Sequence, residues 1–462
     1  MSVENDDKKY LPKFEWLKKS VPNFPVNACN IKLLRSPSEF YQTLIEQCSN
    51  VKSRIVIASL YIGTGKQEVF LINTIKKMLD KIPDLSVRIL LDANRGSRGK
   101  ENSSRTLLLP LINSSNNCRV FLYHTPKLRG IVRWLLAERY NELVGLQHMK
   151  VYIFDDNILI SGANLSQDYF TNRQDRYILI KDSKPLVDFY AGLIDLVGKI
   201  SFHLSSENTL CLDSSMKYHP YKSLYNSFAS EAKFLLLNYY NSHIKKICSG
   251  EELSSDTVVF PLIEFPPFGI HNDSEIITKF LEHAEAESTL NLATGYFNLP
   301  DIYIKTLFKK SKANINVLFS HPMANSFQTA KGPASFIPTA YSVLTSNFYK
   351  EVQKYNLENR IKCFEYEKTG WTFHSKGLWY IPKNYKWPIF TIIGSSNYGA
   401  RSLNCDLESQ IIILTDNQKL QKTFFMEKCD SYKSAIIYTP NCEKLIVPLW
   451  IRFVLKIFKN YF

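Results

Sequence analysis

The chain has 462 residues, which is long for a single hydrophobic core and indicates two or three domains. Its hydrophobic content of 45% and charged content of 22% are typical of a globular protein, and its nine scattered cysteines form no C-x-x-C pair, which argues against a disulfide framework or a structural zinc site and fits a reducing compartment. The net charge of +14 predicts a polyanionic partner: nucleic acid, an anionic membrane surface, or both.

We expect residues 1–33 to form an extension before the folded domains. The opening segment MSVENDDKKYLPKFEWLKKS has no long apolar stretch, so it predicts no secretory signal. It also differs from an Arg-rich, acid-poor mitochondrial presequence, because Glu4, Asp6 and Asp7 come early. In the whole sequence, no window reaches the roughly eighteen apolar residues that a transmembrane helix needs.

Residues 34–204 are expected to form the first of two α/β halves. The apolar run at 54–62 predicts a buried strand, residues 69–82 predict a helix, and residues 87–91 predict a second strand. The stretch Gly63-Thr64-Gly65-Lys66 lacks the G-x-x-x-x-G-K-[ST] spacing of a phosphate loop. It therefore predicts a strand-to-helix turn at the rim of a site, near Tyr61.

A basic run, RGSRGK, follows the strand that ends at Asp92. Arg95 and Arg98 in this run could hold a phosphate by bidentate contacts, together with exposed backbone amides. On composition alone, a solvated basic loop is an equal alternative. The position after the C-terminal end of a strand favours substrate binding.

The first half ends in a pattern that carries chemistry. His148-x-Lys150-x-x-x-x-Asp155 opens a strand-like segment, which is followed by a small-residue turn ending at Asn164 and, eleven residues later, by Asp175. Residues i and i+2 of a strand point to the same face, so His148 and Lys150 project together. A single copy would carry no weight, because a partly buried histidine beside a solvated lysine explains it.

A second copy of the pattern changes that judgement. His374-x-Lys376 is followed by a small-residue turn ending at Asn397 and, again eleven residues later, by the acid Glu408. The position five after Lys376 is Ile381, so the final acid of the first motif is missing from this copy. Two copies with the same turn and the same spacing indicate a duplicated site.

The segments before the second motif also repeat the order of the first half. Residues 205–256 are a polar connector with a helical stretch, and residues 257–443 form the second half, with a strand at 290–298, a helix at 302–311 and a strand from Ile315. Alternating strands and helices predict βαβ units and a mostly parallel sheet in each half. We expect an α/β fold of two α/β/α sandwich halves, related by an internal repeat, with the active site at their interface.

The residue types suit phosphoryl transfer. A histidine can attack phosphorus while a lysine neutralises the non-bridging oxygens. A carboxylate on the other ring nitrogen, from Asp175 or Glu408, would orient the histidine, and Asn164 and Asn397 would add neutral donors. No His/Cys/carboxylate cluster has metal-ligand spacing, so neither a metal nor a cofactor is expected.

At these residues the chain resembles the phospholipase D superfamily, whose signature is H-x-K-x-x-x-x-D followed by G-S/G-x-N. The similarity tightens in ASLYIGTGK, DANRGSRGKENSSRTLLLPL, ATGYFNL, GWTFHSKGLWY and IGSSNYGARSLNCDLESQI, which resemble the eukaryotic mitochondrial phosphatidyltransferases that use CDP-diacylglycerol and glycerol 3-phosphate. It extends from about Leu34 to the C-terminus. The resemblance implies phosphatidylglycerophosphate and CMP as products, through a covalent phosphatidyl-histidine, and a peripheral location on the mitochondrial inner membrane.

The resemblance also implies residue roles. His148, from the complete motif, is the expected nucleophile and His374 the acid and base, with the reverse order as the alternative. In this superfamily the acid at the position of Asp155 has a supporting role, so Ile381 makes the halves unequal without removing a two-histidine site. The candidates for substrate binding are Tyr61, Arg95, Arg98, Arg173, Arg176 and Tyr296.

Other functions share parts of this pattern. A phosphatidylserine synthase or a cardiolipin synthase would differ only in the acceptor pocket, and a phospholipase D hydrolase would use water as acceptor. A nuclease of the same superfamily would use the positive charge on a nucleic-acid backbone. A noncatalytic membrane-binding module would need only a basic helix. We expect no nucleic-acid partner, because the detailed resemblance favours a lipid substrate.

The C-terminal segment, residues 444–462, predicts a basic amphipathic helix. Such a helix suits an anionic headgroup region, and a terminal helix docked on the protein is the alternative. The stretch RGIVRWLLAERY, residues 129–140, is a second candidate for membrane contact. The candidate membrane residues of the C-terminal helix are Trp450, Arg452, Phe453, Lys456 and Phe458.

Overall fold

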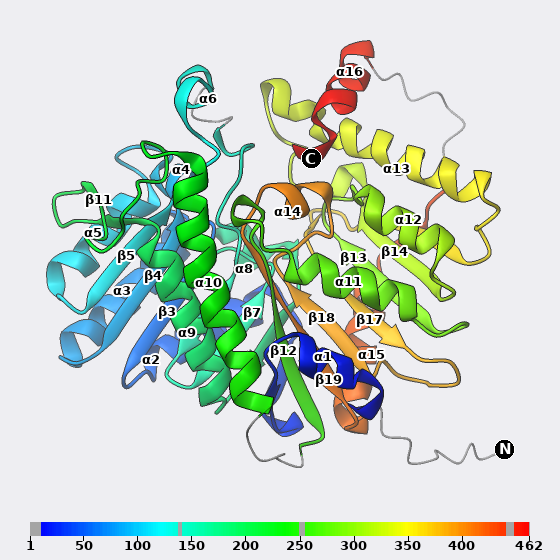
Figure 1. The fold of residues 1–462 in the computed structure, drawn as a ribbon, viewed down its shortest axis with the longest axis horizontal. Coiled ribbons are helices and arrows are strands. Elements are labelled where there is room, and N and C mark those ends of the chain that lie inside the picture. Colours follow the sequence, from blue (N-terminus) through cyan, green and yellow to red (C-terminus); the bar gives the residue numbers. More distant parts are fainter. Residues whose placement is uncertain (1–10, 137–140, 249–254, 440–447, 462) are drawn as a thin grey trace.

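A computed structural model describes residues 11–136, 141–248, 255–439 and 448–461. Two nine-stranded sheets stand side by side, and helices pack around them (Figure 1). In spatial order, the first sheet contains β11 (Leu210–Leu212), β10 (Phe202–Leu204), β5 (Cys118–Tyr123), β4 (Ser86–Asp92), β3 (Arg54–Ala58), β6 (Val151–Phe154), β7 (Asn157–Ser161), β9 (Tyr177–Ile180) and β2 (Ile31–Leu34).

The second sheet has the same plan. In spatial order, it contains β1 (Phe24–Pro25), β12 (Thr257–Glu264), β19 (Glu408–Thr415), β18 (Phe390–Gly394), β17 (Gly377–Ile381), β13 (Thr289–Thr294), β14 (Asn314–Ser320), β15 (Ile361–Tyr366) and β20 (Ala435–Ile437). The first sheet runs β2-β9-β7-β6-β3-β4-β5 and the second runs β12-β19-β18-β17-β13-β14-β15, with matching places in chain order. The predicted α/β class and internal repeat are confirmed.

The predicted mostly parallel sheets are wrong. Only β3, β4 and β5 run parallel in the first sheet, and only β13, β14 and β15 in the second. From β6 and β17 onward the neighbouring strands are antiparallel, because β6 and β7 form a hairpin, as do β17 and β18. A hairpin needs no crossover helix, so the βαβ pattern covers only the first three strands of each repeat.

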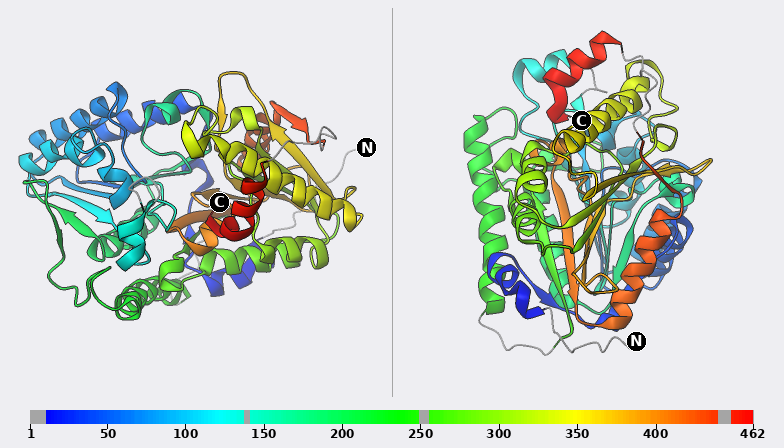
Figure 2. Two further views of the ribbon diagram at one scale, coloured as in Figure 1. Left: turned by 90° about the horizontal axis from the view of Figure 1, so that it is seen from above. Right: turned by 90° about the vertical axis from the view of Figure 1, so that its right-hand side faces the viewer.

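The helices cover the sheets on both sides, and α9 and α10 run alongside the junction of the two halves (Figures 1 and 2). The first half and the connector carry α2 (Pro37–Ser49), α3 (Lys66–Lys81), α4 (Ala93–Ser97), α5 (Ser104–Ser114), α6 (Gly130–Leu135), α8 (Gln167–Thr171), α9 (Lys184–Lys199) and α10 (Tyr225–Cys248). The second half carries α11 (Asn272–His283), α12 (Asp301–Lys309), α13 (Ile337–Lys354), α14 (Ala400–Asn404), α15 (Gln418–Tyr432) and α16 (Leu449–Phe458).

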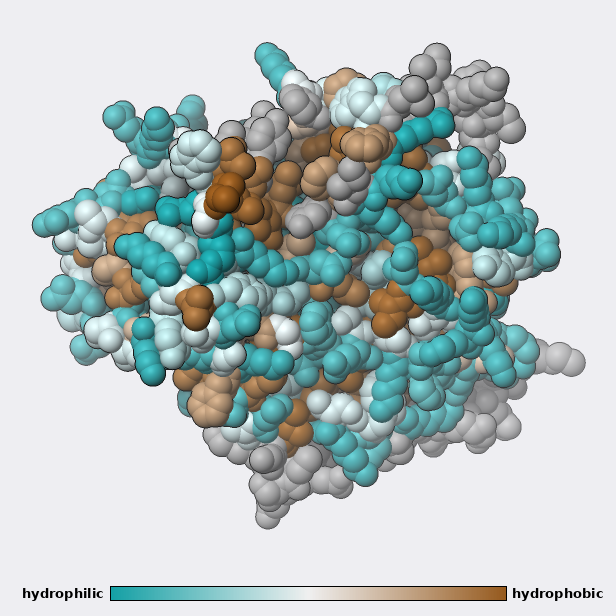
Figure 3. Space-filling view, turned by 45° about the horizontal axis from the view of Figure 1, so that its top comes forward, coloured by the Kyte–Doolittle hydropathy of each residue, from teal (hydrophilic) through white to brown (hydrophobic). Residues whose placement is uncertain are grey.

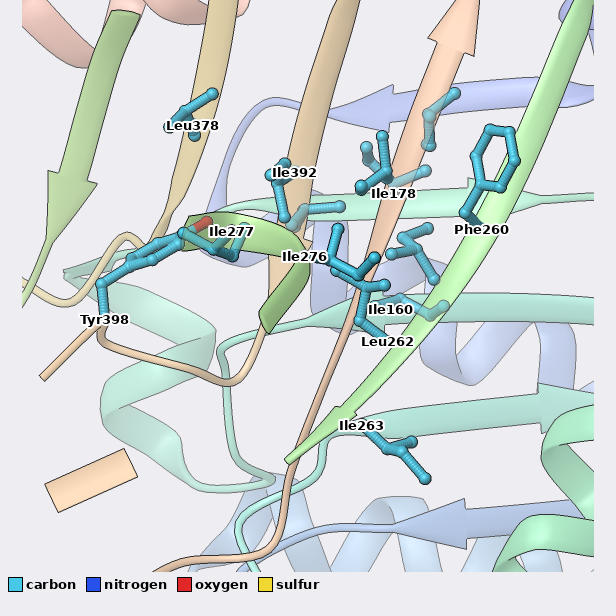
Figure 4. Packing of buried hydrophobic residues seen from close by; sticks show 14 of the residues in the cluster. Ile160, Ile178, Phe260, Leu262, Ile263, Ile276, Ile277, Leu378, Ile392 and Tyr398 are labelled. Atoms are coloured by element: carbon cyan, nitrogen blue, oxygen red, sulfur yellow. The ribbon is translucent and has the colours of Figure 1, made fainter. Parts of the chain in front are cut away.

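Alternation along the strands explains how one sheet serves two cores. In β3, Ile55 and Ile57 pack under the outer helices, whereas Val56 and Ala58 belong to a central cluster. Successive side chains of a strand point to opposite faces, so an all-apolar strand is buried on both sides. The central cluster combines residues of both sheets, and Figure 4 shows Ile160 and Ile178 of the first sheet close to residues of the second. This shared core fixes the halves against each other.

The N-terminal segment joins both halves. The short helix α1 (Glu15–Ser20) precedes β1, which pairs with β12 of the second sheet, and β2 pairs with β9 of the first. Residues 24–34 thus add one strand to each sheet. Most of these residues belong to the segment 1–33 that was expected to form an extension before the folded domains. The connector contains β11 and the long helix α10, which packs on α9.

Candidate active site

Each candidate histidine is held by backbone pairing with the other half. The N–H of His148 donates to the carbonyl of Leu407 at 2.9 Å, and the N–H of His374 donates to the carbonyl of Gln174 at 2.8 Å. The second contact continues a short parallel pairing of β16 (Thr372–Phe373) with β8 (Arg173–Gln174). In both cases the pairing residue directly precedes the candidate acid of the opposite half.

This pairing crosses the two acids over. The His148 Nδ1 lies 3.0 Å from both carboxylate oxygens of Glu408, and the His374 Nδ1 lies 2.6 Å from Asp175 Oδ2. The acid of each half therefore orients the histidine of the other half. The sequence named both acids as partners for the histidines but did not decide this pairing, because the spacing within each copy says nothing about contact between copies.

The two lysines lie beside the histidines, as the i, i+2 spacing requires. Lys150 Nζ donates to the His148 carbonyl and Lys376 Nζ to the His374 carbonyl, both at 2.6 Å. Both side chains are buried. Burial lowers the pKa of Lys150 well below its usual value, and burial, partly opposed by Asp175, lowers the pKa of Lys376 to about 8.

A glycine makes room for one of these lysines. A β-carbon at Gly162 would lie 2.8 Å from Lys376 Cδ and 2.7 Å from Asp175 Oδ1. Any larger residue at position 162 would therefore displace the lysine or the acid of the second histidine. This close approach gives a physical reason for the small residues in the repeated turn.

Burial dominates the titration of both histidines. It lowers the pKa of His148, against the charge of Glu408, and it lowers the pKa of His374 still further, together with the charges of Lys376 and Arg173. Neutral imidazoles that donate Nδ1–H to a carboxylate keep a lone pair on Nε2. That is the protonation state that a nucleophile or a general base needs.

The asparagines of the two turns differ. Asn164 Nδ2 donates to the hydroxyl of Tyr169 at 3.1 Å, and its Oδ1 accepts from the N–H of Leu60 at 3.3 Å. Among the described residues, the buried Oδ1 of Asn397 has no hydrogen-bond partner. The Tyr169 hydroxyl also lies 3.3 Å from His374 Nε2, so Tyr169 joins the first turn to the second histidine. Tyr169 is not part of the repeated motif, although it follows Asn164 by five residues.

The comparisons with known proteins agree with this geometry. The sequence model of the family described as "Cardiolipin synthase, PLD-like domain" matches residues 44–193. The mitochondrial CDP-diacylglycerol–glycerol-3-phosphate 3-phosphatidyltransferase of Gallus gallus is 39% identical, covering 97% of this chain and 86% of that protein. The enzyme of the same name from Homo sapiens is 38% identical with the same coverage. The chain belongs to this phosphatidyltransferase family.

A solved structure supports the fold of this phosphatidyltransferase. The phosphatidylserine synthase of Haemophilus influenzae Rd KW20 superposes with a TM-score of 0.71 at 20% identity, covering 97% of this chain and 96% of that one. At this identity the likeness extends to the fold alone. The two-sheet architecture is thus shared along nearly the full length of both chains.

Two expected site residues lie elsewhere in the phosphatidyltransferase. Arg176, a predicted substrate ligand, is buried and bonded to Glu427 by two nitrogens, to Thr391 Oγ1 and to the carbonyl of Ile392. Its guanidinium is bound by residues of the second half, so Arg176 joins the halves, and this geometry does not favour the predicted substrate binding.

Asp155 is also remote from the chemistry. It follows β6 at the end opposite His148, and its carboxylate accepts from the N–H groups of Lys52, Ser53 and Arg54. It therefore supports a loop and has no contact with the histidines. This placement explains why Ile381, at the corresponding end of β17, leaves the second half-site complete.

The remaining substrate candidates differ in their contacts, and among them Tyr296 packs directly against a histidine. The Tyr296 ring centroid lies 5.7 Å from that of His374, and the Arg173 guanidinium lies 4.5 Å above the Tyr169 ring. Arg95 lies 4.3 Å above the ring of Tyr61. Arg95 and Arg98 both face Glu142, at 3.9 and 3.2 Å. These residues of the first half form a basic rim that already contains one acid.

One trio of described residues could hold a metal ion: His148, Asp406 and Glu408, whose ligand atoms lie within 4.8 Å of one another. The repeated motif does not include Asp406, although this residue lies two positions before Glu408. Arg401 donates to both carboxylate oxygens of Asp406, at 2.8 and 3.1 Å, and the N–H of Leu146 donates to one of them at 2.9 Å. A metal ion at this trio would therefore compete with the Arg401 guanidinium, so these residues fit a metal ion poorly.

The C-terminal helix is docked on one face and exposed on the other. Ile451 and Leu455 are buried against Ala340 of α13, whereas Trp450 and Phe453 are 47% and 64% exposed. The alternative expectation for this segment, a terminal helix docked on the protein, applies to the buried face of α16, and membrane contact by the exposed face stays a prediction. The stretch at 129–140 contributes α6, with Trp134 83% exposed, and residues 137–140 lie outside the described residues.

Proposed function

We propose that this phosphatidyltransferase moves the phosphatidyl group of CDP-diacylglycerol to sn-glycerol 3-phosphate, giving phosphatidylglycerophosphate and CMP. The observation that carries the proposal is the pair of crossed histidine–acid dyads, each with a buried lysine, in a chain that matches named relatives of this activity nearly end to end. Two histidines suit a double displacement, because one forms a covalent intermediate while the other moves protons.

In the first step, His148 Nε2 attacks the phosphatidyl phosphorus. A P–N bond forms and the P–O bond to CMP breaks, while His374, which enters this step protonated at Nε2, donates that proton to the departing phosphate oxygen and so becomes the neutral base of the second step. In the second step, His374 removes the proton from the 1-hydroxyl of glycerol 3-phosphate, whose oxygen displaces His148 from phosphorus. Lys150 and Lys376 neutralise the non-bridging oxygens throughout, and Glu408 and Asp175 hold the two rings in the required tautomers.

The acceptor carries a dianionic phosphate, so its pocket needs cations beyond the two lysines. Arg173 is the candidate nearest to His374, since its charge contributes to the lowered pKa of that ring. Arg95 and Arg98 are the candidates on the side of the first half, where Glu142 would release them to a stronger anion. Serine carries no phosphate, so the basic rim favours glycerol 3-phosphate over serine as the acceptor.

We further propose that the enzyme works peripherally on an anionic membrane, the mitochondrial inner membrane. Among the described residues, no helix is long and apolar enough to cross a bilayer. The exposed apolar residues of α6 and α16 come from different halves, and both helices lie on the upper side in Figure 1. Figure 3 shows apolar residues on this side bordered by hydrophilic ones. Aromatic and aliphatic side chains flanked by arginine and lysine suit a headgroup region.

The proposal is tested by offering labelled CDP-diacylglycerol with glycerol 3-phosphate, serine, phosphatidylglycerol or water, and separating the lipid products by thin-layer chromatography. We expect a product with glycerol 3-phosphate and none with the other acceptors. Product with serine alone would establish a phosphatidylserine synthase instead. Cleavage of single-stranded nucleic acid without any lipid product would establish a nuclease.

A further inference from the structure

A large cavity lies in the second half, outside the two histidine–acid dyads. It has a volume of about 1380 Å³ and is formed mainly by α12 and α13, with contributions from α16 and β20. Typical small-molecule pockets measure about 300–1,000 Å³. The cavity is therefore large enough for a ligand bigger than a metabolite. In Figures 1 and 2, α12, α13 and α16 lie together on one side of the second sheet.

Aromatic packing separates this cavity, called the groove from here on, from the histidine–acid dyads. Phe297 stacks on Phe319 at 5.1 Å between ring centroids and meets Phe348 edge-on at 5.0 Å. On the other side of this layer, Tyr296 packs against His374 and against Tyr341. None of the four dyad residues is among the described residues that line the groove.

The lining combines apolar and cationic side chains. Ile304, Phe308, Leu344, Phe348 and Leu455 give it an apolar interior. Its basic residues are Lys305, Lys309, Lys350, Arg452, Lys456 and Lys459, against the three carboxylates of Asp301, Glu351 and Glu365.

Position along the helices separates the two kinds of lining. Lys305 and Lys309 are exposed residues one turn apart on α12, whereas Ile304 and Phe308, each one position earlier, are partly covered. Residues i and i+4 lie on one face of a helix, so α12 turns a basic row outward beside an apolar row facing inward. Lys456 and Arg452 of α16 form another i, i+4 basic row on the groove.

The chemistry of this lining selects an amphiphile with a negative head. A nucleotide or a sugar phosphate would leave the apolar interior uncovered, and an uncharged lipid would leave the excess of cations without a partner. The groove also adjoins α16, whose exposed aromatic residues mark the surface that we assign to the bilayer. A lipid can therefore reach the groove without leaving the membrane.

We propose that this groove binds one anionic phospholipid at a site separate from the catalytic site. The acyl chains lie on Ile304 and Phe308 between α12 and α13, and the phosphate lies among Lys305, Lys309 and Lys456. The site does not depend on the transferase reaction, and it places a lipid that is not a substrate beside the C-terminal helix.

The test uses the full chain and phosphatidylglycerol with a photoreactive diazirine in an acyl chain, carried in phosphatidylcholine vesicles. After irradiation, mass spectrometry of peptides locates the label, and we expect it on α12 and α13. The double variant Lys305→Glu/Lys309→Glu should lower labelling of these peptides at least tenfold. Its unfolding temperature and its activity on soluble short-chain substrate should stay at the wild-type values.

The internal repeat provides a matched control. Lys81 ends α3 as Lys309 ends α12, and Lys77 precedes it by four residues as Lys305 precedes Lys309. The variant Lys77→Glu/Lys81→Glu changes the same charges at equivalent positions of the first half, and it should label like the wild type.

Three results would overturn the proposal. One is label that is absent from α12 and α13, or present there equally in the Lys305→Glu/Lys309→Glu variant. The second is loss of this label when unlabelled CDP-diacylglycerol is added in excess, which would make the groove part of the substrate site. The third is equal labelling by a phosphatidylcholine probe, which would show that the cations do not select the head group. Since activity is measured separately, none of these results is confused with a failure of the proposed transferase function.

Discussion

The two half-sites of this phosphatidyltransferase share a backbone plan but differ in electrostatics. Both histidines precede a strand, pair with the residue before the acid of the other half, and carry a lysine two positions later. At His148 the lysine stays with the carbonyl, and Ser402 donates to Glu408 at 2.9 Å. At His374 the lysine Nζ also lies 2.7 Å from the ring Nδ1.

The acids reflect this difference. Burial would raise the pKa of Glu408, but His148 and Lys150 hold it below its usual value. Burial raises the pKa of Asp175 to about 6, because the opposing charge of Lys376 only partly compensates. A firmly ionised acid fixes the tautomer of His148, which suits a nucleophile, whereas His374 lies beside an acid and a lysine whose pKa values burial shifts toward neutrality. The comparison thus supports the order expected from motif completeness.

The largest expected effect separates the two histidines directly. His148→Ala and His374→Ala should each lower kcat by on the order of 10⁴-fold or more, because each removes a reacting group. With radiolabelled CDP-diacylglycerol, a phosphatidyl-enzyme should accumulate in His374→Ala and be absent from His148→Ala, as measured on denatured protein. An adduct that survives in His148→Ala and disappears in His374→Ala would reverse the roles.

The pH profile should show the cluster around His374. Below about pH 6, Asp175 becomes protonated and can no longer support the imidazolium, and above about pH 8, Lys376 loses the charge that neutralises phosphate oxygens. We therefore expect kcat to fall on both sides, with apparent pKa values that belong to the coupled group. Asp175→Asn should remove the acidic limb and Lys376→Arg the basic limb. A profile unchanged in both variants would contradict this assignment.

Substitution of an arginine expected to bind the acceptor should have a smaller effect than substitution of a histidine. A charge-assisted contact contributes about 1.5–3 kcal/mol, so Arg98→Ala and Arg173→Ala should each raise the KM for glycerol 3-phosphate about tenfold or more. The KM for CDP-diacylglycerol should change little. Lys77→Ala, which changes a distant exposed cation, is the control. A variant that weakens only the nucleotide lipid would show that its arginine holds the diphosphate.

Asp155 and Ile381, which lie five residues after the two motif lysines, differ between the halves. Substitutions at Asp155 should affect stability and leave the reaction rate unchanged. Asp155→Ala deprives the N–H groups of Lys52, Ser53 and Arg54 of their acceptor, so urea unfolding should show a loss of about 1–3 kcal/mol with kcat per folded molecule unchanged. Ile381→Asp should give no gain in kcat, because this position is at the far end of its strand. A large loss of kcat in Asp155→Ala would return this residue to the active site.

The smallest expected effect concerns the possible metal ligands His148, Asp406 and Glu408. Among the described residues, no matching group includes His374. Enzyme treated with a chelator should keep its full turnover on soluble short-chain substrate, since lysines and Arg401 already neutralise the local acids. The rate before and after chelation, and after adding back a divalent ion, is the measurement. Complete loss of turnover that is restored by a metal ion would contradict the expectation.

Local patterns made much of this enzyme predictable. The i, i+2 spacing places each histidine beside its lysine, the apolar runs give the buried parallel strands, and the repeat of both patterns gives the two equivalent halves. These features depend on neighbours within a few residues, whose geometry is set by the strand itself.

Contacts between the halves decided the rest. The exchange of Asp175 and Glu408, the burial of Arg176 against Glu427 and the place of Tyr169 beside His374 all join residues about 200 or more positions apart. No spacing within one copy of a motif encodes which face of it meets the other copy. That choice arises when the two sheets bury a common hydrophobic core, because only the packed halves bring each acid within hydrogen-bonding distance of the opposite histidine.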